Sequence, residues 1–198
     1  MGKNQSKLSP KLVENLRNET HFTDSEIKQW YQDFVKEFPS GRVTQRQFKE
    51  AFRRQFANGD PSKLAEHVFR TFDTDQDGSI DFREFMCYLS VTSRGTPEQK
   101  LTWAFSMFDV DVDGFVQKDE MIKMIGAIYK AFGYEPSGSP QDEARTPERE
   151  TERLFQLMDK DRDGKLSLEE FLEGAKKEPF IAALVNREVE APPLEKKK

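Results

Sequence analysis

The most regular pattern along this chain is a helical spacing of apolar residues that is interrupted three times by a short acidic stretch. Val68, Phe69 and Phe72 precede the first acidic stretch, and Phe85, Met86 and Leu89 follow it. Offsets of three and four residues place apolar side chains on one face of a helix. The other two copies read Ala104, Phe105 and Phe108 before Met121, Ile122 and Ile125, and Leu154, Phe155 and Met158 before Phe171, Leu172 and Ala175. The pattern predicts three helix–loop–helix units.

Each acidic stretch has the residue order of a calcium-binding loop. The loops are residues 73–84, 109–120 and 159–170, and each has aspartate at positions 1, 3 and 5, glycine at position 6 and glutamate at position 12. Ca²⁺ binds six to eight oxygens, which this order supplies from carboxylates, the backbone carbonyl of position 7 and a side chain or water at position 9. Glycine permits the sharp turn at position 6. The predicted metal ligands are Asp73, Asp75, Asp77, Ser79, Asp81, Glu84, Asp109, Asp111, Asp113, Phe115, Gln117, Glu120, Asp159, Asp161, Asp163, Lys165, Ser167 and Glu170.

A fourth copy of the pattern lies at residues 36–47, one repeat before loop 73–84. The glycine at position 6 and the apolar residue at position 8 survive in it, and an amphipathic helix follows. The ligands do not survive, because Lys36 replaces the first carboxylate and Gln47 cannot supply the bidentate anion of position 12. We predict that this degenerate loop binds no calcium and serves as the structural partner of loop 73–84.

Every loop has an apolar residue at position 8, where a short strand can pair with the neighbouring loop. These residues are Val43, Ile80, Val116 and Leu166. The sequence therefore predicts an all-α protein of four helix–loop–helix units in two paired lobes, with short β bridges between paired loops.

The expected divisions are an N-terminal arm and first helix (1–22), a first pair (23–92), a second pair (93–178) and a C-terminal helix with a Pro/Lys tail (179–198). Residues 133–146 contain two glycines and two prolines, which predict a flexible linker inside the second pair. Helix starts are predicted at Thr23 and Thr96, which form capping boxes with Glu26 and Gln99, and at Asp60 and Thr146, which precede prolines.

The charge of the chain points to a metal rather than to a basic partner. Net charge is −5, and 15 of the 36 acidic residues lie in the three loops. No basic face or motif indicates nucleic-acid binding. The single cysteine, Cys87, and the lack of an apolar secretory segment fit a reducing, cytosolic setting. His21 and His67 belong to no nucleophile or zinc motif, so no enzyme activity is expected.

The N-terminus has the acceptor pattern for N-myristoylation. Removal of the initiator methionine would expose Gly2, and Ser6 completes the motif. One myristoyl chain anchors a protein only marginally, and a nearby basic cluster supplies the second signal to acidic lipid. Lys3, Lys7 and Lys11 form such a cluster.

Several segments together have a specific combination of residues. They are the acceptor start, 30–31 with 39–41, 65–70, 80–85, 93–95, 103–106 and 163–171. Over roughly residues 1–181, the chain resembles the neuronal calcium sensors, the group of recoverin, visinin-like proteins, hippocalcin, neurocalcin and frequenin. It is most similar to the neurocalcin, hippocalcin and visinin-like side, in which the second, third and fourth loops are intact.

The resemblance implies four EF-hands, a myristoylated Gly2, and a cytoplasmic protein that associates peripherally with membranes in a calcium-dependent manner. It also implies binding of an amphipathic helix from a target kinase, cyclase, channel or receptor. The candidate residues for the target groove are Trp30, Phe34, Phe48, Phe52, Phe56, Phe69, Phe82, Phe85, Met86 and Leu89. Dimerisation and Mg²⁺ binding in resting sites are left open.

Three features depart from the family pattern. Phe38 stands where members usually have cysteine, residues 133–145 lack the usual apolar run, and the tail 190–198 matches no close member. Because C-terminal segments of this family contact targets, the target is left open. Loop 159–170 contains three bases against one in each other loop, so we expect it to be the weakest site.

Three functions fit the loops. The first is a calcium sensor that exposes apolar surface and regulates targets at membranes. The second is a calcium buffer, which needs the same loops without a conformational response. The third is a dedicated regulatory subunit that an enzyme or channel holds even at resting calcium.

Overall fold

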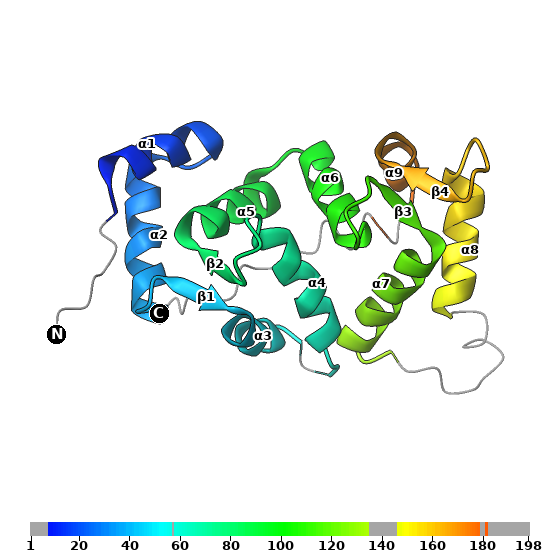
Figure 1. Cartoon of the computed structure of the whole chain (residues 1–198), viewed down its shortest axis with the longest axis horizontal. Coiled ribbons are helices and arrows are strands. Elements are labelled where there is room, and N and C mark those ends of the chain that lie inside the picture. Colours follow the sequence, from blue (N-terminus) through cyan, green and yellow to red (C-terminus); the bar gives the residue numbers. More distant parts are fainter. Residues whose placement is uncertain (1–7, 57, 135–145, 179–180, 182–198) are drawn as a thin grey trace.

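The computed structural model describes residues 8–56, 58–134, 146–178 and 181, and helices dominate them (Figure 1). The elements are α1 (Pro10–Glu19), α2 (Asp24–Glu37), β1 (Arg42–Thr44), α3 (Gln45–Arg53), α4 (Ser62–Phe72), β2 (Ser79–Asp81), α5 (Phe82–Arg94), α6 (Pro97–Phe108), β3 (Phe115–Gln117), α7 (Lys118–Ala131), α8 (Pro147–Met158), β4 (Lys165–Ser167) and α9 (Leu168–Ala175). In this part of the chain no helix is both long and apolar enough to cross a membrane.

Most of the predicted helix starts are confirmed. Thr23 and Thr96 form complete capping boxes at α2 and α6, and the Thr146 side chain caps α8. The start of α4 differs, because the helix begins one residue later than expected, with Pro61 as its N-cap. Asp60 instead accepts a hydrogen bond from the Ser62 N–H at 3.1 Å, so its carboxylate stabilises the turn before the helix.

The predicted β bridges are present in both lobes. Strand β1 pairs antiparallel with β2, and Val43 lies opposite Ile80. Strand β3 pairs in the same way with β4, and Val116 lies opposite Leu166. Each bridge therefore joins two loops back to back, which confirms the all-α fold of paired helix–loop–helix units.

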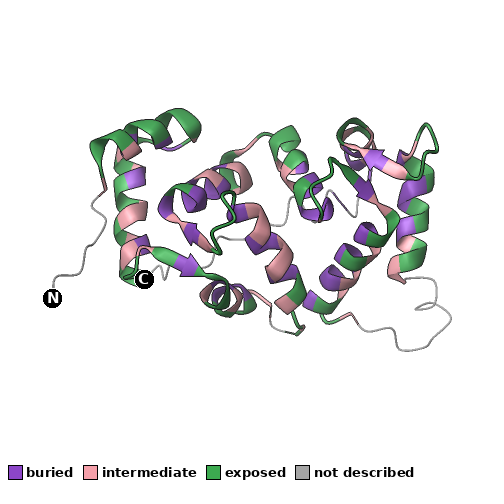
Figure 2. Ribbon diagram, viewed as in Figure 1, coloured by how far each residue is buried: buried purple, intermediate pink, exposed green. Residues whose placement is uncertain are grey.

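Aromatic side chains fill the core of each lobe. In the first lobe the Phe34 ring of α2 lies 5.4 Å from Phe82 and 5.2 Å from Phe85, measured between centroids. In the second lobe Phe171 lies 5.5 Å from Phe105 and 5.7 Å from Phe108. The buried faces of the helices turn toward these cores, and the loops stay exposed (Figure 2).

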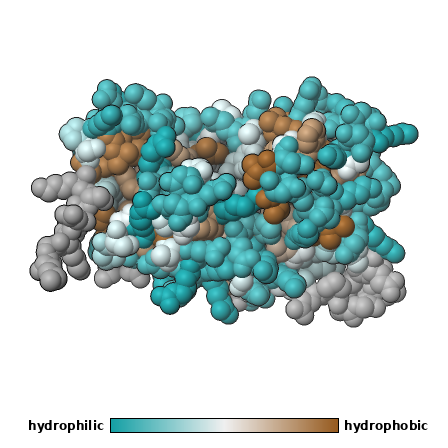
Figure 3. Space-filling view, in the orientation of Figure 1, coloured by the Kyte–Doolittle hydropathy of each residue, from teal (hydrophilic) through white to brown (hydrophobic). Residues whose placement is uncertain are grey.

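The two lobes meet along α4, which contacts both α6 and α7 of the second lobe. Aromatic rings span the junction, with Tyr88 5.4 Å from Trp103 and Phe56 5.2 Å from Phe132. On the face drawn in Figure 3 the surface is mostly hydrophilic, with apolar side chains gathered over α1 and α2 and over α6. Of the predicted linker, only residues 133, 134 and 146 are described. Of the predicted C-terminal helix and tail, only Ile181 is described.

Candidate metal centres

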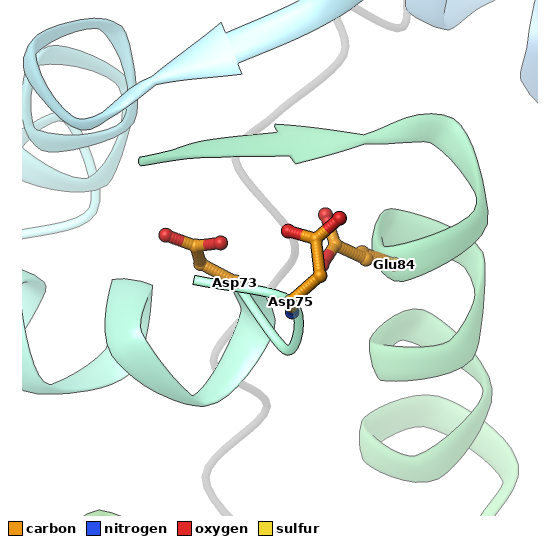
Figure 4. A group of neighbouring side chains, drawn as sticks. All are labelled: Asp73, Asp75 and Glu84. Carbon is orange, nitrogen blue, oxygen red and sulfur yellow. Dashed lines mark hydrogen bonds between the residues drawn. The ribbon is translucent and has the colours of Figure 1, made fainter. Parts of the chain in front are cut away.

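Three groups of carboxylates come together in the described residues, one in each predicted calcium loop. Within each group one oxygen per residue lies within 4.8 Å of the others. Figure 4 shows the first group, in which Asp73 follows α4, Asp75 lies in the loop and Glu84 reaches back from α5. The other groups are Asp109, Asp111 and Glu120, and Asp159, Asp161 and Glu170. Positions 1, 3 and 12 of each loop therefore converge from three different parts of the unit.

Backbone N–H groups hold the first carboxylate of each loop in place. Asp73 Oδ2 accepts from the Gly78 N–H at 2.9 Å, and Asp109 and Asp159 accept from the equivalent glycines at 3.2 and 3.1 Å. Gly78 has a φ of +83°, which glycine adopts without steric cost. The backbone of each loop thus wraps around the aspartate at position 1.

Position 4 of each loop also has a left-handed backbone, which the sequence did not reveal. Gln76, Val112 and Arg162 have φ values of 58°, 61° and 60°. The left-handed region costs a residue with a Cβ roughly 1–2 kcal/mol. Glycine, asparagine and aspartate are the residues that give a sequence signal for such a conformation, and none of the three positions has one.

The glutamate at position 12 connects the start of each loop to the helix that follows it. Glu84 Oε1 accepts from the Thr74 N–H at 2.8 Å, and Glu84 Oε2 accepts from the Asp81 N–H at 2.9 Å. Glu120 and Glu170 make the equivalent pairs of hydrogen bonds. Glu84 Oε1 also accepts from the Thr74 hydroxyl at 3.0 Å and from the Asp75 N–H at 3.4 Å, so a cation at this oxygen would replace hydrogen bonds from the loop.

Two buried oxygens test whether the residues fit a cation. Among the described residues, neither Asp73 Oδ1 nor Asp159 Oδ1 has a hydrogen-bond partner. A buried carboxylate oxygen without a partner is costly, and a hard divalent cation satisfies it. All-oxygen groups with no histidine or cysteine favour Ca²⁺ or Mg²⁺ over zinc.

The three groups differ in exposure. Asp73, Glu84, Asp109 and Glu120 are buried, whereas Asp159 and Glu170 are only half-buried. Burial raises the pKa of Glu170, but hydrogen bonds from Ser167 and from the loop backbone outweigh it and keep the pKa below its usual value. The third loop is therefore the most solvated of the three groups.

The aspartates at position 5, and Asp81 at position 9, are not part of the close groups. Asp77 Oδ1 accepts from the Ser79 N–H at 2.9 Å and from the Ser79 hydroxyl at 2.7 Å, while its other oxygen contacts Arg42. These contacts, the Ser79 hydroxyl first, hold the pKa of Asp77 below its usual range. Asp113 and Asp163 likewise accept the N–H two residues on, at 2.9 and 2.8 Å.

Position 9 caps the helix that follows each loop. Asp81 Oδ1 accepts from the Glu84 N–H at 2.9 Å, and Ser167 Oγ accepts from the Glu170 N–H at 3.3 Å. At Gln117 the contact is the reverse one, in which the Gln117 N–H donates to Glu120 Oε2 at 2.9 Å. The carbonyl of position 7, from Ser79, Phe115 or Lys165, lies in the strand of each loop.

The degenerate loop keeps the architecture without the carboxylates. Gln47 accepts from the Thr44 N–H at 3.0 Å, which reproduces the capping box of the other loops. No metal-type group forms at residues 36–47, all of which the structure describes. Its Arg42 side chain points to the neighbouring loop and donates to Ser79 Oγ at 2.8 Å.

The predicted groove residues form part of the core. Eight of them are buried: Phe34, Phe48, Phe52, Phe69, Phe82, Phe85, Met86 and Leu89. Trp30 and Phe56 are partly buried against the same cluster. Gly2, Lys3 and Lys7 lie outside the described residues, and Lys11 is exposed on α1.

Comparison with known proteins places these loops in a family. The EF-hand domain pair matches residues 37–90 and 98–176. Neuronal calcium sensor 1 of Lymnaea stagnalis is 49% identical over 181 residues, covering 91% of this chain and 94% of its own. Human recoverin is 39% identical over 189 residues (95% and 94% of the two chains), and chicken visinin is 36% identical over 189 residues (95% and 98%). The chain belongs to the neuronal calcium sensor family of EF-hand proteins.

Proposed function

We propose that the protein is a calcium sensor that binds three Ca²⁺ ions and regulates target proteins at membranes. The observation that carries the proposal is the threefold repetition of one carboxylate group, formed by positions 1, 3 and 12 of each intact loop. Membership of the neuronal calcium sensor family supports the sensor function. The two lobes are assigned to residues 23–92 and 93–178.

Each ion would be held by the carboxylates at positions 1, 3, 5 and 12, the carbonyl at position 7 and a side chain or water at position 9. The close groups provide three of these ligands directly. Position 5 has to turn toward the ion, and in loop 73–84 this means that Asp77 releases Arg42. The oxygens of Asp73 and Asp159 that have no partner among the described residues would gain one. The same chemistry allows Mg²⁺ to occupy sites at rest.

The glutamate at position 12 is the group that converts binding into movement. It lies in the first turn of α5, α7 or α9, so capture of both its oxygens by an ion pulls on that helix. Eight of the ten residues of the proposed groove are buried, and these eight belong to α2, α3, α4 and α5. Exposing them requires these helices to separate, as they do in sensor EF-hands.

The exposed surface would bind an amphipathic helix of a target kinase, cyclase, channel or receptor. A myristoyl group on Gly2, together with Lys3, Lys7 and Lys11, would provide the lipid anchor and the basic cluster that peripheral association with the cytoplasmic leaflet needs. Calcium would then change the affinity for membranes, because it would change how accessible the myristoyl group and the apolar surface are. The protein itself would catalyse no reaction.

A vesicle co-sedimentation experiment tests this proposal. Myristoylated wild type and Gly2→Ala are spun with phosphatidylserine-containing vesicles, each with calcium and with chelator. Wild type should pellet in calcium and remain in the supernatant in chelator, and Gly2→Ala should remain in the supernatant in both. Equal pelleting of the two proteins would refute the lipid-dependent switch.

An apolar dye separates the sensor from a buffer. The dye should bind more strongly to the calcium-loaded protein if apolar surface is exposed, and its signal should stay unchanged if the loops only buffer the ion. A variant with Glu84→Gln, Glu120→Gln and Glu170→Gln provides the control, because it should not respond to calcium.

A further inference from the structure

The Arg70 side chain crosses from the first lobe to the entrance of a calcium loop in the second. It lies in the last turn of α4, three residues before Asp73. Its Nη1 donates to the Asp109 carbonyl at 2.8 Å and also contacts the Val110 carbonyl, while its Nη2 donates to the carbonyls of Ser106 and Met107 at 3.1 and 3.2 Å. One guanidinium thus binds four carbonyls at the junction of α6 and loop 109–120.

These contacts satisfy a specific requirement of α6. The last four carbonyls of a helix have no partner within it, and a positive charge there is favourable. The last turn of α6 has no basic residue of its own, so Arg70 of α4 supplies the charge from the other lobe. The planar fork of arginine holds five N–H donors on three nitrogens in a fixed geometry, whereas lysine has three donors on one flexible nitrogen.

Arg70 also lies within the electrostatic reach of the second lobe's ligands. It is half-buried, and this burial lowers its pKa, while Asp109, Glu120 and Asp111 of loop 109–120 act in the opposite direction. A second hydrogen bond fixes the same junction, because Trp103 Nε1 of α6 donates to Thr71 Oγ1 of α4 at 3.1 Å. The C-terminal ends of α4 and α6 are therefore held together directly in front of two calcium loops.

We propose that Arg70 is a positioning residue that couples calcium binding in loop 73–84 to calcium binding in loop 109–120. This inference rests on the proposed function. Calcium on Asp73 fixes the last turn of α4 and with it the Arg70 guanidinium. The fixed guanidinium holds the Asp109 and Val110 carbonyls at the entrance of loop 109–120, so less ordering remains for the second ion to bring about.

The β bridges do not provide this connection. Bridge β1–β2 joins loop 73–84 to the degenerate loop, and bridge β3–β4 joins loop 109–120 to loop 159–170. The route through Arg70 connects one intact loop of each lobe. Coupling between binding sites is reciprocal, so each loop should raise the affinity of the other by the same factor.

The test measures the affinity of each loop with and without an intact partner loop. Calcium occupancy is followed by NMR at the Gly78 and Gly114 amides, which donate to the first aspartate of their loops at 2.9 and 3.2 Å. Glu84→Gln removes one ion and Glu120→Gln the other. The coupling factor is the fold by which Glu84→Gln lowers the calcium affinity of loop 109–120, or by which Glu120→Gln lowers that of loop 73–84. It is measured in three backgrounds: wild type, Arg70→Met and Arg46→Met.

Arg46→Met is the matched control, because it removes the same charge from an exposed position of α3. Wild type and Arg46→Met should show equal coupling in both directions, of at least about fivefold, the lower end of the usual range. Arg70→Met should reduce the factor to less than about twofold. Arg70→Lys keeps the charge but not the planar fork, so it should give an intermediate coupling factor. It replaces Arg70→Met in the test if Arg70→Met does not fold.

The outcomes separate this inference from the proposed function. A merely structural Arg70 would lower the affinity of loop 109–120 equally with and without Glu84, which leaves the factor unchanged. An unchanged factor in Arg70→Met, or in Arg70→Lys should Arg70→Met not fold, would overturn the inference and leave the three calcium sites intact. Amide signals that do not respond to calcium in wild type would overturn the proposed function and the inference with it.

Discussion

Val43 of the degenerate loop lies directly opposite Ile80 of loop 73–84, and both side chains are 1% exposed. The degenerate loop has lost its carboxylates but keeps this strand residue and the glutamine that caps its helix. Its remaining role is thus to pair, through strand β1, with the strand of loop 73–84. Val116 and Leu166 form the same pair between two intact loops in the second lobe.

Shortening Val43 should therefore weaken a calcium site that Val43 does not touch. Val43→Ala removes apolar contacts that stabilise the fold by about 2 kcal/mol and should lower the free energy of unfolding in urea by this order. It should also weaken calcium binding at Gly78 more than at Gly114 or Gly164. Val116→Ala is the control, and it should reverse that order. Equal effects of both variants on all three amides would contradict the pairing argument.

Replacing the position-12 glutamate by glutamine should abolish one site at a time without unfolding the unit. Gln47 already occupies this position in the degenerate loop and forms the same capping box. Glu84→Gln, Glu120→Gln and Glu170→Gln should each reduce the calorimetric stoichiometry from three ions to two. Glutamine has one acceptor oxygen in place of two, so each metal-free variant should lose about 1–3 kcal/mol of unfolding free energy and remain folded.

The three variants also rank the sites. Loop 159–170 has three bases and the most exposed ligands, so it should be the weakest. Glu170→Gln should then remove the last ion to bind, and the two tighter transitions should remain. Loss of the tightest transition in Glu170→Gln would refute this ranking.

Glu26 provides a pH-dependent contribution to stability. The Arg94 side chain first, and then the backbone and hydroxyl of Thr23, lower the pKa of Glu26 from 4.5 to about 2. Because the folded pKa lies below the unfolded one, the contribution is complete above pH 4.5 and is lost as the pH falls toward 2.

Glu26→Gln should keep the capping geometry and lose the ion pair with Arg94, whose Nη2 lies 2.5 Å from Glu26 Oε1. In calcium-free buffer, wild type should therefore be more stable than Glu26→Gln at pH 6, and the difference should shrink as the pH approaches 2. Urea midpoints at several pH values measure it. A difference that stays constant with pH would show that folding does not lower the pKa of Glu26.

Gly59 brings the two lobes into backbone contact. A Cβ at this position would lie 2.2 Å from the Ala131 carbonyl oxygen and 2.3 Å from that of Lys130. Gly59→Ala should destabilise the protein by about 1–3 kcal/mol, since the backbone of one lobe has to move. Gly126→Ala is the control, because its Cβ would meet only Pro147 Cγ at 3.8 Å, and it should be neutral or stabilising. Equal unfolding midpoints of the two variants would contradict the contact.

The elements of this fold follow from strong local signals. The sequence predicts the helix–loop–helix units, the capping boxes of Thr23 and Thr96, and the bridges between neighbouring loops at position 8, because each depends on residues at fixed spacing. The convergence of positions 1, 3 and 12 follows from the same spacing. The left-handed residue at position 4 had no signal, since Gln76 has the side chain of an ordinary exposed residue.

Contacts between the lobes could not be predicted from the sequence. Arg70 reads as an ordinary basic residue at a helix end, and its carbonyl partners lie 36 to 40 residues away. The family resemblance implies the ten groove candidates, and all of them are apolar, a property that core residues share. Sequence alone does not separate a side chain that stays buried from one that calcium exposes.

As a sensor, the protein should bind three ions and move its helices in response. Isothermal titration calorimetry of the metal-free protein with calcium, combined with amide spectra at each point, tests both parts. Three ions per chain are expected, together with amide shifts that extend from the loops to α2 and α5. Fewer than three ions, or amide spectra that coincide outside the loops in the empty and saturated protein, would contradict this expectation.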